Sequence, residues 1–380
     1  MPPTHSHTTP SIAFAAGWTA GHIVPAITLA HAWQNRFPNS NTHFFTGTFP
    51  WEQQILEQHG FPNTPINVLP WKNQSLARKL LCLARLPKNT RTAQHSLQTI
   101  APKLVFSCGG FVSIPATLAA KKMGIPIVIF EPNAIFGAAN QRLAPDAALI
   151  ITSSLTPNPN STVKTLAAGV PLPQSLLDQA QSHQTQFPKP NEPLNVLVTG
   201  GSLGSGFLNQ NTPALTATLA KHLSHSLKIT HLAGRKSDPQ PILTEYQKLD
   251  LDAEVLPYHH QIEDAYAATH FAISSAGANS LHELAAFGIP TLIVPLAGAA
   301  DDHQSSNARA FSNITKAPVT TEAEWSRDPA AASKPALTLL EDPARWTEAA
   351  QNMRAFPNLD ATNKMIEALR DLIAQEYTPA

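Results

Sequence analysis

Two glycine-bearing turns provide the residue types that bind a phosphate group. The first lies in Asn195–Asn209, which reads NVLVTGGSLGSGFLN, an apolar run followed by Gly200, Gly201 and Gly204 and then by a helix start. A strand, a glycine turn and a helix in succession present backbone N–H groups and a positive helix end to an anion. The turn matches neither a Walker loop nor GxGxxG, and taken alone it is equally typical of a tight connection.

The second turn, Ser275–Glu283, reads SAGANSLHE and also follows an apolar run. Its small residues, Ala278 among them, allow a diphosphate to approach the N–H groups of the helix that begins here. Glu283 lies one turn into that helix, where a carboxylate can hold two ribose hydroxyls. Ser280 and Glu283 also fit a capping box, which is compatible with the first interpretation. We interpret the two turns as facing each other across the donor site of a sugar-nucleotide transferase.

A histidine and a carboxylate have positions suited to proton transfer. His22 follows the turn GWTAG at the start of a helix, where the helix end disfavours the imidazolium and keeps the imidazole in its basic, neutral form. Glu131 ends the apolar run GIPIVIF. The competing interpretation of His22, in a chain with 16 histidines, is a helix-start side chain bonded to backbone. No His or Cys spacing is typical of a zinc site, so we expect no metal.

Alternating strands and helices must bring these residues together. Apolar strands at 11–16, 42–46, 103–106 and 124–130 alternate with helical stretches, which predicts parallel β-α-β units. Ligands of open parallel sheets gather beyond the carboxyl ends of the strands. We therefore expect one edge of the sheet to carry the polar residues that follow strands, namely Thr19, His22, Ser113, Glu131 and Asn133, with Asn140 on the next helix.

The length of 380 residues suits two domains. The stretch 153–195 is rich in Pro, Ser, Thr, Gln and Asn, and we place the boundary inside it. The prediction is a first domain over 1–168 and a second over 169–359. A last helix within 360–380 is expected to pack back on the first domain.

The formal net charge of zero hides an asymmetry. Residues 1–170 hold 12 Lys and Arg against 4 Asp and Glu, and the remainder holds 14 against 22. The basic half indicates either a phosphate-bearing or membrane partner or a merely solvated face. Two cysteines are too few for a disulfide framework, and neither a signal peptide nor a spanning run is visible, so the expected location is the cytoplasm.

The segment Trp71–Leu86 reads WKNQSLARKLLCLARL, with leucines at helical spacing, four basic residues and no acid. A basic amphipathic helix of this kind can lie on an anionic bilayer. The alternative is an ordinary amphipathic helix packed on the sheet. Considered alone, the segment favours this alternative.

Six separated segments resemble the MurG family of glycosyltransferases in their order and spacing. They are GWTAGHIVPA, SCGGFVSIPATLAA, GIPIVIFEPN, VLVTGGSLGSGFLNQ, AYAATHFAISSAGANSLHELAAFGIPTLIVP and DDHQSSNA. The resemblance covers nearly the whole chain. It implies an α/β fold of the GT-B type, with two Rossmann-like, doubly wound parallel-sheet domains and an interdomain cleft.

The activity implied is that of an inverting hexosyltransferase that needs no metal and no cofactor. Such an enzyme moves GlcNAc from UDP-GlcNAc to the MurNAc 4-hydroxyl of lipid I, giving lipid II for peptidoglycan synthesis. The resemblance implies peripheral binding to the cytoplasmic face of the cell membrane and no nucleic-acid partner. It also makes docking on an anionic membrane the preferred interpretation of Trp71–Leu86.

Carried over by position, the family's site falls on three groups of residues. The catalytic candidates are His22, as the general base, and Glu131. The donor is expected to contact Gly201, Ser202, Gly204, Ala278, Glu283 and Gln304. The acceptor is expected to contact Thr19, Gly21, Ser113, Asn133 and Asn140.

The chain departs from the family pattern at both turns. Where the family has GGTGGH, Trp18 and Ala20 replace two glycines and restrict the approach of a phosphate to the backbone. Two donor-side arginines are absent, one from 170–173 and one at Ser275, so Arg235, Lys236 or a backbone turn must compensate. Two alternatives stay open: a transferase with another lipid-linked or glycolipid acceptor, and a non-catalytic relative that only binds nucleotide.

Overall fold

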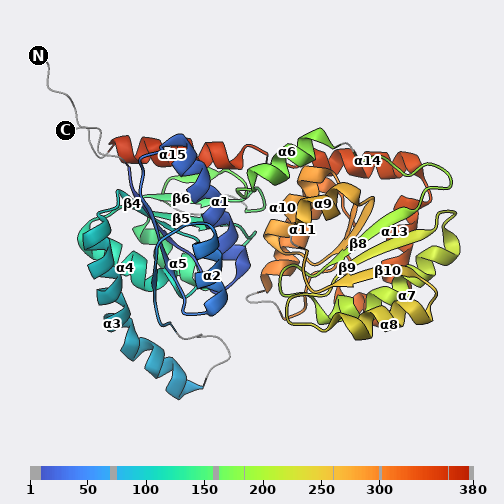
Figure 1. Cartoon of the computed structure of the whole chain (residues 1–380), viewed down its shortest axis with the longest axis horizontal. Helices are drawn as coiled ribbons and strands as arrows, with labels where there is room; N and C mark the ends of the chain where they lie inside the picture. The colour runs from blue at the N-terminus through green and yellow to red at the C-terminus, as the bar shows by residue number, and fades with distance from the viewer. Residues whose placement is uncertain are drawn as a thin grey trace, which may run out of the picture. The chain divides into compact units, whose positions relative to one another are not determined.

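The structure is a computed structural model, and it describes residues 10–68, 75–156, 162–183, 185–259, 261–298, 302–357 and 359–375. The chain divides into two compact units. The first unit comprises 1–132, 136–171 and 360–380, and the second comprises 133–135 and 172–359. Each unit is built on a parallel sheet with helices packed around it (Figure 1).

The sheet of the first unit has seven strands in the order β3-β2-β1-β4-β5-β6-β7, all paired in parallel. The central strands are short apolar runs, and helices bury them on both faces. The strands are β1 Ile12–Ala15, β2 Thr42–Thr46, β3 Asn63–Pro65, β4 Leu104–Ser107, β5 Ile127–Glu131, β6 Leu149–Thr152 and β7 Thr165–Ala167.

The helices of the first unit include the last one of the chain, which packs against α1. They are α1 Ala20–Arg36, α2 Pro50–Gln58, α3 Leu76–Ile100, α4 Ser113–Met123, α5 Ala138–Leu143 and α15 Ala361–Gln375, with a 3-10 turn at Ala144–Asp146. Helix α15 is amphipathic, and it buries Met365, Ile366 and Leu369.

The sheet of the second unit has five parallel strands in the order β10-β9-β8-β11-β12. The strands are β8 Leu194–Thr199, β9 Leu227–Leu232, β10 Asp252–Leu256, β11 Phe271–Ser274 and β12 Thr291–Ile293. The helices are α6 Gln174–Ser182, α7 Gly206–His222, α8 Pro239–Lys248, α9 Ile262–Ala268, α10 Ala278–Phe287, α11 His303–Thr315, α12 Glu322–Arg327, α13 Ala330–Leu340 and α14 Pro343–Arg354. The core of this unit includes the buried rings of Tyr246, Phe271 and Trp346.

Both sheets change winding direction at one place, between β1 and β4 in the first unit and between β8 and β11 in the second. In open parallel sheets, ligands bind beyond the carboxyl ends of the strands at such a switch point. The predicted site residues follow these four strands and β5, except for Gln304, which follows β12. The two doubly wound parallel sheets that were predicted are confirmed.

Several elements differ from their prediction. Helix α1 begins at Ala20, two residues before the predicted start at His22, and it contains Pro25. The stretch 153–195, inside which we placed the domain boundary, contains two elements that were not predicted: β7, which pairs with β6, and α6, which buries Leu176 and Leu177. Helix α3 extends to Ile100 because its second half buries apolar residues, and residues 71–74 of the predicted membrane segment lie outside the described residues.

Candidate active site

The first unit presents His22 in the first turn of α1, beyond the carboxyl end of β1. Its Nδ1 lies 3.0 Å from the carbonyl oxygen of Gly17 and 3.2 Å from Oγ1 of Thr19. A carbonyl oxygen only accepts, so Nδ1 carries the hydrogen in the first contact and Nε2 keeps the lone pair. A Cβ on Gly110, which has a φ of +76°, would lie 3.3 Å from Nδ1. The glycine therefore lets the turn after β4 support the imidazole.

The other polar residues predicted at this edge are buried and bonded within the unit. Glu131 is only 2% exposed, and its Oε2 accepts hydrogen bonds of 2.9 Å from Gly137 N and from Asn140 Nδ2. Ser113 is fully buried and donates to the carbonyl of Gly110 at 2.7 Å. These contacts favour a role in shaping the turns over direct contact with an acceptor. Thr19 is half-buried and Gly21 is exposed at the helix end.

In the second unit, backbone N–H groups of glycines form hydrogen bonds within the turn between β8 and α7. Gly201 N donates to Thr199 Oγ1 at 3.1 Å, and Gly204 N donates to the Gly201 carbonyl at 3.0 Å. Gly201 and Gly204 have φ values of +75° and +76°. A Cβ on Gly204 would overlap the backbone of Ala233, so close packing also requires this glycine. Two amides predicted for the diphosphate are thus engaged inside the turn.

The turn after β11 meets this glycine turn at one side chain, Ser280. Cβ atoms built on Gly201 and on Gly277 would each lie 3.9 Å from Ser280 Oγ. Helix α10 begins at Ala278 with Gly277 as its N-cap, so its first N–H groups lie beside the turn that contains Gly201. The predicted capping box is wrong, because Ser280 lies inside the helix and no side chain caps it.

Glu283 accepts a hydrogen bond of 2.7 Å from the hydroxyl of Tyr266 on α9. Burial raises the pKa of Glu283, and the hydrogen bond from Tyr266 opposes that rise. Burial and the neighbouring carboxylate raise the pKa of Tyr266 well above its usual value, so its hydroxyl remains a donor. The sequence analysis missed Tyr266, since no local motif marks a tyrosine on a separate helix.

Gln304 and Asn307, both on α11, fix the backbone around this site. Gln304 Oε1 accepts from Ala276 N at 3.0 Å and from Leu296 N at 2.9 Å, so only its amide N–H groups can serve a ligand. Asn307 is fully buried and donates to the Ala276 carbonyl at 3.0 Å and to Asn133 Oδ1 at 3.1 Å. Asn133, predicted to bind the acceptor, thus lies in a segment held by the second unit.

Arg235 provides a cation next to the glycine turn. Its backbone N–H donates to the Ser202 carbonyl at 3.3 Å, and its guanidinium carbon lies 4.2 Å from the ring centre of Tyr258. Stacking on an aromatic face restrains a guanidinium without consuming its charge. Arg235 is therefore placed to supply the positive charge that the two arginines missing from the family pattern would otherwise provide.

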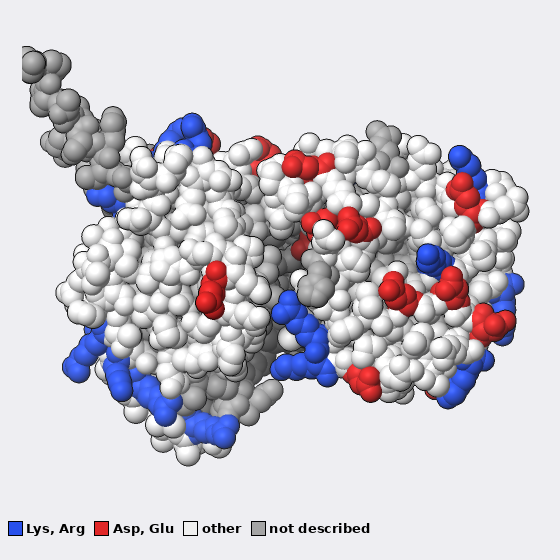
Figure 2. All heavy atoms as spheres, viewed as in Figure 1, with Lys and Arg blue, Asp and Glu red and all other residues white. Residues whose placement is uncertain are grey.

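Helix α3 carries an exposed apolar surface among basic residues. Its first three turns expose Leu76 (74%), Leu80 (58%), Leu81 (44%) and Leu83 (51%). Lys and Arg side chains gather over this part of the first unit (Figure 2). Among the described residues, no helix is long and apolar enough to span a bilayer.

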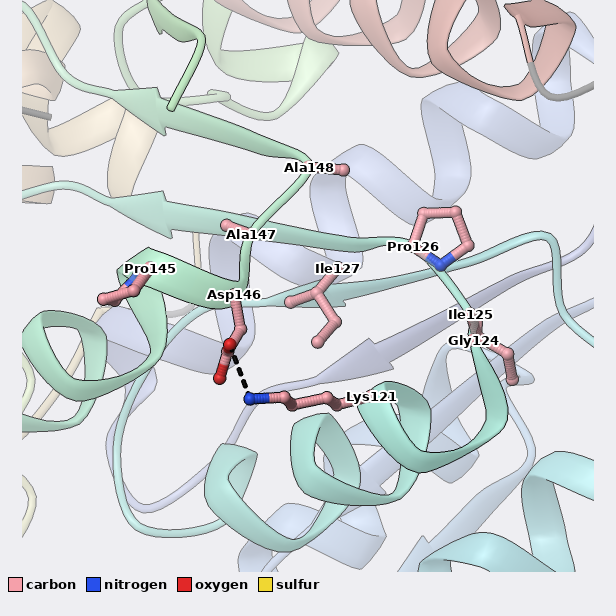
Figure 3. A pocket seen from close by; sticks show the side chains of 9 residues that line it. All are labelled: Lys121, Gly124, Ile125, Pro126, Ile127, Pro145, Asp146, Ala147 and Ala148. Atoms are coloured by element: carbon pink, nitrogen blue, oxygen red, sulfur yellow. Dashed lines mark hydrogen bonds and ion pairs between the residues drawn. The ribbon is translucent and has the colours of Figure 1, made fainter. Parts of the chain in front are cut away.

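A separate cavity of about 330 Å³ lies at the amino ends of β5 and β6 (Figure 3). Its lining includes Lys121 and Asp146, which form an ion pair of 2.6 Å. It contains none of the predicted site residues, and it lies at the edge of the sheet opposite to theirs. We therefore do not assign it to the candidate active site.

Comparisons with known proteins agree with the two-unit architecture. Residues 12–152 match the glycosyltransferase family 28 N-terminal domain, and residues 195–365 match the glycosyltransferase family 28 C-terminal domain. The chain is 32% identical over 362 residues to the UDP-N-acetylglucosamine--N-acetylmuramyl-(pentapeptide) pyrophosphoryl-undecaprenol N-acetylglucosamine transferase of Tolumonas auensis, covering 94% of this chain and 98% of that protein. It is 31% identical to the enzyme of the same name from Nitrobacter hamburgensis, covering 98% of this chain and all of that protein.

Solved structures give the same result. The crystal structure of Acinetobacter baumannii MurG matches with a TM-score of 0.76 and 25% identity, covering 95% of this chain and 99% of that chain. The kitacinnamycin glycosyltransferase matches with a TM-score of 0.70 at 16% identity, which shows a shared fold. With both domains of family 28 in place and close to a third of its residues shared with full-length relatives, the chain belongs to the MurG family of glycosyltransferases.

Proposed function

We propose that the protein transfers GlcNAc from UDP-GlcNAc to the MurNAc 4-hydroxyl of lipid I, which gives lipid II for peptidoglycan synthesis. The names of its relatives describe a transfer of this kind, and the chain aligns with them over most of its length. The observation that carries the proposal is the meeting of two glycine turns around Ser280, with Glu283 one helical turn away.

In this proposal the second unit holds the donor. The diphosphate binds against the first N–H groups of α10, from Ala278 onward, and against the turn at Ser202, with Arg235 as the nearby cation. Glu283 accepts hydrogen bonds from the ribose hydroxyls, and the amide N–H groups of Gln304 donate to the GlcNAc. The same positive groups stabilise UDP as it leaves, so the transfer proceeds without a metal ion.

The first unit holds the acceptor at the start of α1. Nε2 of His22 takes the proton from the MurNAc hydroxyl, whose oxygen attacks the anomeric carbon as UDP departs from the opposite face. This single displacement inverts the anomeric centre. Thr19 and Gly21 contact the acceptor diphosphate at the helix end, while Glu131, Ser113 and Asn140 hold the turns in place.

The protein acts as a peripheral enzyme on the cytoplasmic face of the cell membrane, where lipid I is available. The exposed leucines of α3 insert among anionic lipids, and neighbouring basic side chains bind their headgroups. The exposed fractions of Leu76, Leu80 and Leu83 support this role. Among the described residues, no other helix exposes so many leucines.

Turnover of UDP-GlcNAc with a lipid I analogue tests the proposal. His22→Ala should lower kcat by roughly 10²- to 10⁴-fold through loss of the base. Glu283→Ala should raise the KM for UDP-GlcNAc by roughly 10-fold or more through loss of charge-assisted hydrogen bonds. His222→Ala and Glu254→Ala, at exposed positions of the second unit, serve as controls. Turnover unaffected by both site changes would refute the assignment.

One observation favours a second candidate, a transferase with another glycolipid acceptor. The ring of Trp18, which replaces a glycine of the family pattern, packs against Phe49 and Phe111 with ring centres 5.0 Å and 6.2 Å apart. Hydrolysis of UDP-GlcNAc without any use of lipid I would favour this candidate. No binding of UDP-GlcNAc at millimolar concentration in calorimetry would instead indicate a non-catalytic relative.

A further inference from the structure

The carboxylate of Glu52, on α2, is fully buried beneath the turn that carries His22. A Cβ on Gly17 would lie 2.6 Å from one of its oxygens, and a Cβ on Gly47 would lie 2.6 Å from the other. Side chains at these two positions would displace the carboxylate. Both glycines therefore make room for a group that the proposed mechanism has not used.

One peptide group connects this carboxylate to the imidazole. The N–H of Trp18 donates to Glu52 Oε1, and the carbonyl of Gly17 lies 3.0 Å from His22 Nδ1. The N–H of Trp18 and the C=O of Gly17 are the two ends of the same peptide bond, which is rigid and planar. An orientation that points the N–H at Glu52 therefore points the C=O at His22.

The backbone conformation of Trp18 is unfavourable for a residue with a side chain, so it needs a restraint from elsewhere in the structure. Trp18 has a φ of +73°, a region that residues with a Cβ rarely adopt. The hydrogen bond to a buried carboxylate supplies such a restraint, since bonds to ionised acceptors are among the strongest. Burial raises the pKa of Glu52, and the N–H groups of Trp18 and Phe49 oppose that rise by stabilising the carboxylate.

We propose that Glu52 is a positioning residue that fixes the tautomer of His22 through the peptide group between Gly17 and Trp18. With the Gly17 carbonyl held in place, Nδ1 must carry the hydrogen, and Nε2 carries the lone pair that the base needs. Without this carbonyl as acceptor, the Thr19 hydroxyl, 3.2 Å from Nδ1, can donate its hydrogen to Nδ1 and favour the tautomer with hydrogen on Nε2. The catalytic consequence rests on the proposed function, whereas the tautomer itself does not.

Nitrogen-15 spectra of histidine-labelled protein measure the tautomer directly. The His22 signals are identified by their absence in His22→Gln. At a pH where the imidazole is neutral, the wild type should show hydrogen on Nδ1, and Glu52→Ala should move most of the population to Nε2. Glu52→Gln keeps an oxygen acceptor and a near-native volume, so it should retain the wild-type tautomer and remain folded if the alanine variant does not.

Two controls separate this role from general loosening of the turn. Trp18→Gly keeps the N–H and adopts positive φ without strain, so it should keep the tautomer although it loses the aromatic packing. Gln53→Ala removes the hydrogen bonds from α2 to Thr46 and Gly47 without changing Glu52, so this variant should also keep the wild-type tautomer of His22. An unchanged tautomer in folded Glu52→Ala, or its loss in Trp18→Gly with Glu52 intact, would overturn the proposal.

Kinetics with the lipid I analogue then test the consequence. Glu52→Ala should lower kcat by roughly 10- to 100-fold, less than loss of the base itself, with little change in either KM. Glu52→Gln should restore most of kcat. A changed tautomer with unchanged kcat in Glu52→Ala would support the role of Glu52 in fixing the tautomer and contradict the role of His22 as the base. The positioning hypothesis and the proposed function therefore fail by different results.

Discussion

Removal of the Tyr266 hydroxyl tests whether Glu283 is held ready for the donor. The hydroxyl donates to the carboxylate at 2.7 Å from a side chain that is only 2% exposed. A hydrogen bond to a charged group contributes about 1.5–3 kcal/mol. If orientation of Glu283 uses about 1.4 kcal/mol of this, Tyr266→Phe should raise the KM for UDP-GlcNAc about 10-fold.

The pH dependence should change in a defined direction. Burial raises the pKa of Glu283 and the Tyr266 hydroxyl lowers it, so the variant should have a still higher pKa at this carboxyl. Because the ribose hydroxyls bind the ionised form best, the donor KM rises as the pH falls. That rise should begin at a higher pH in Tyr266→Phe than in the wild type.

Initial rates at varied UDP-GlcNAc, measured from pH 5.5 to 9, provide the assay. Because the ribose is bound in both the ground state and the transition state, kcat should change less than KM. Tyr246→Phe is the matched control, since its buried hydroxyl bonds to His231 Nδ1 at 2.9 Å instead. An unchanged donor KM and pH profile in folded Tyr266→Phe would refute the reasoning.

Three further predictions concern stability and membrane binding. Burial lowers the pKa of His231 to about 3, below its value in the unfolded chain, so its contribution to stability is complete above pH 6.5 and is lost as the pH falls toward 3. Between pH 7.5 and 5 the free energy of unfolding, measured with urea, should fall by about 2 kcal/mol more in the wild type than in His231→Gln; equal slopes would contradict this. Gly204→Ala should lower the melting temperature because its Cβ overlaps Ala233, whereas Gly206→Ala, with open space around it, should not; equal effects would exclude the packing argument. Leu80→Glu should weaken sedimentation with anionic vesicles, and Leu249→Glu, 42% exposed in the second unit, should not; wild-type binding by Leu80→Glu would speak against docking through α3.

The sequence predicted the strands well because each central strand is a short apolar run buried on both faces. The predicted range 42–46 coincides with β2, and the predicted range 103–106 differs from β4 by one residue at each end. Elements whose stability depends on distant contacts were missed. Strand β7 forms only because β6 offers an edge, and α6 forms because its apolar side can be buried.

The candidate site was predictable where a single segment carries its chemistry. The turns at Gly201 and Ala278 come together, as expected of strands adjacent at a switch point. Supporting contacts between segments were not predictable. Nothing local connects Tyr266 to Glu283, and nothing in the helix PWEQQILEQ shows that its first glutamate lies beneath a turn more than thirty residues earlier.

Whether the second unit holds the donor diphosphate is tested most directly by a crystal structure with UDP bound. The predicted result is a diphosphate against the first N–H groups of α10 and the turn at Ser202, with the ribose hydroxyls on the carboxylate of Glu283. UDP bound at the start of α1, or anywhere without contact to α10, would contradict the assignment of the donor site.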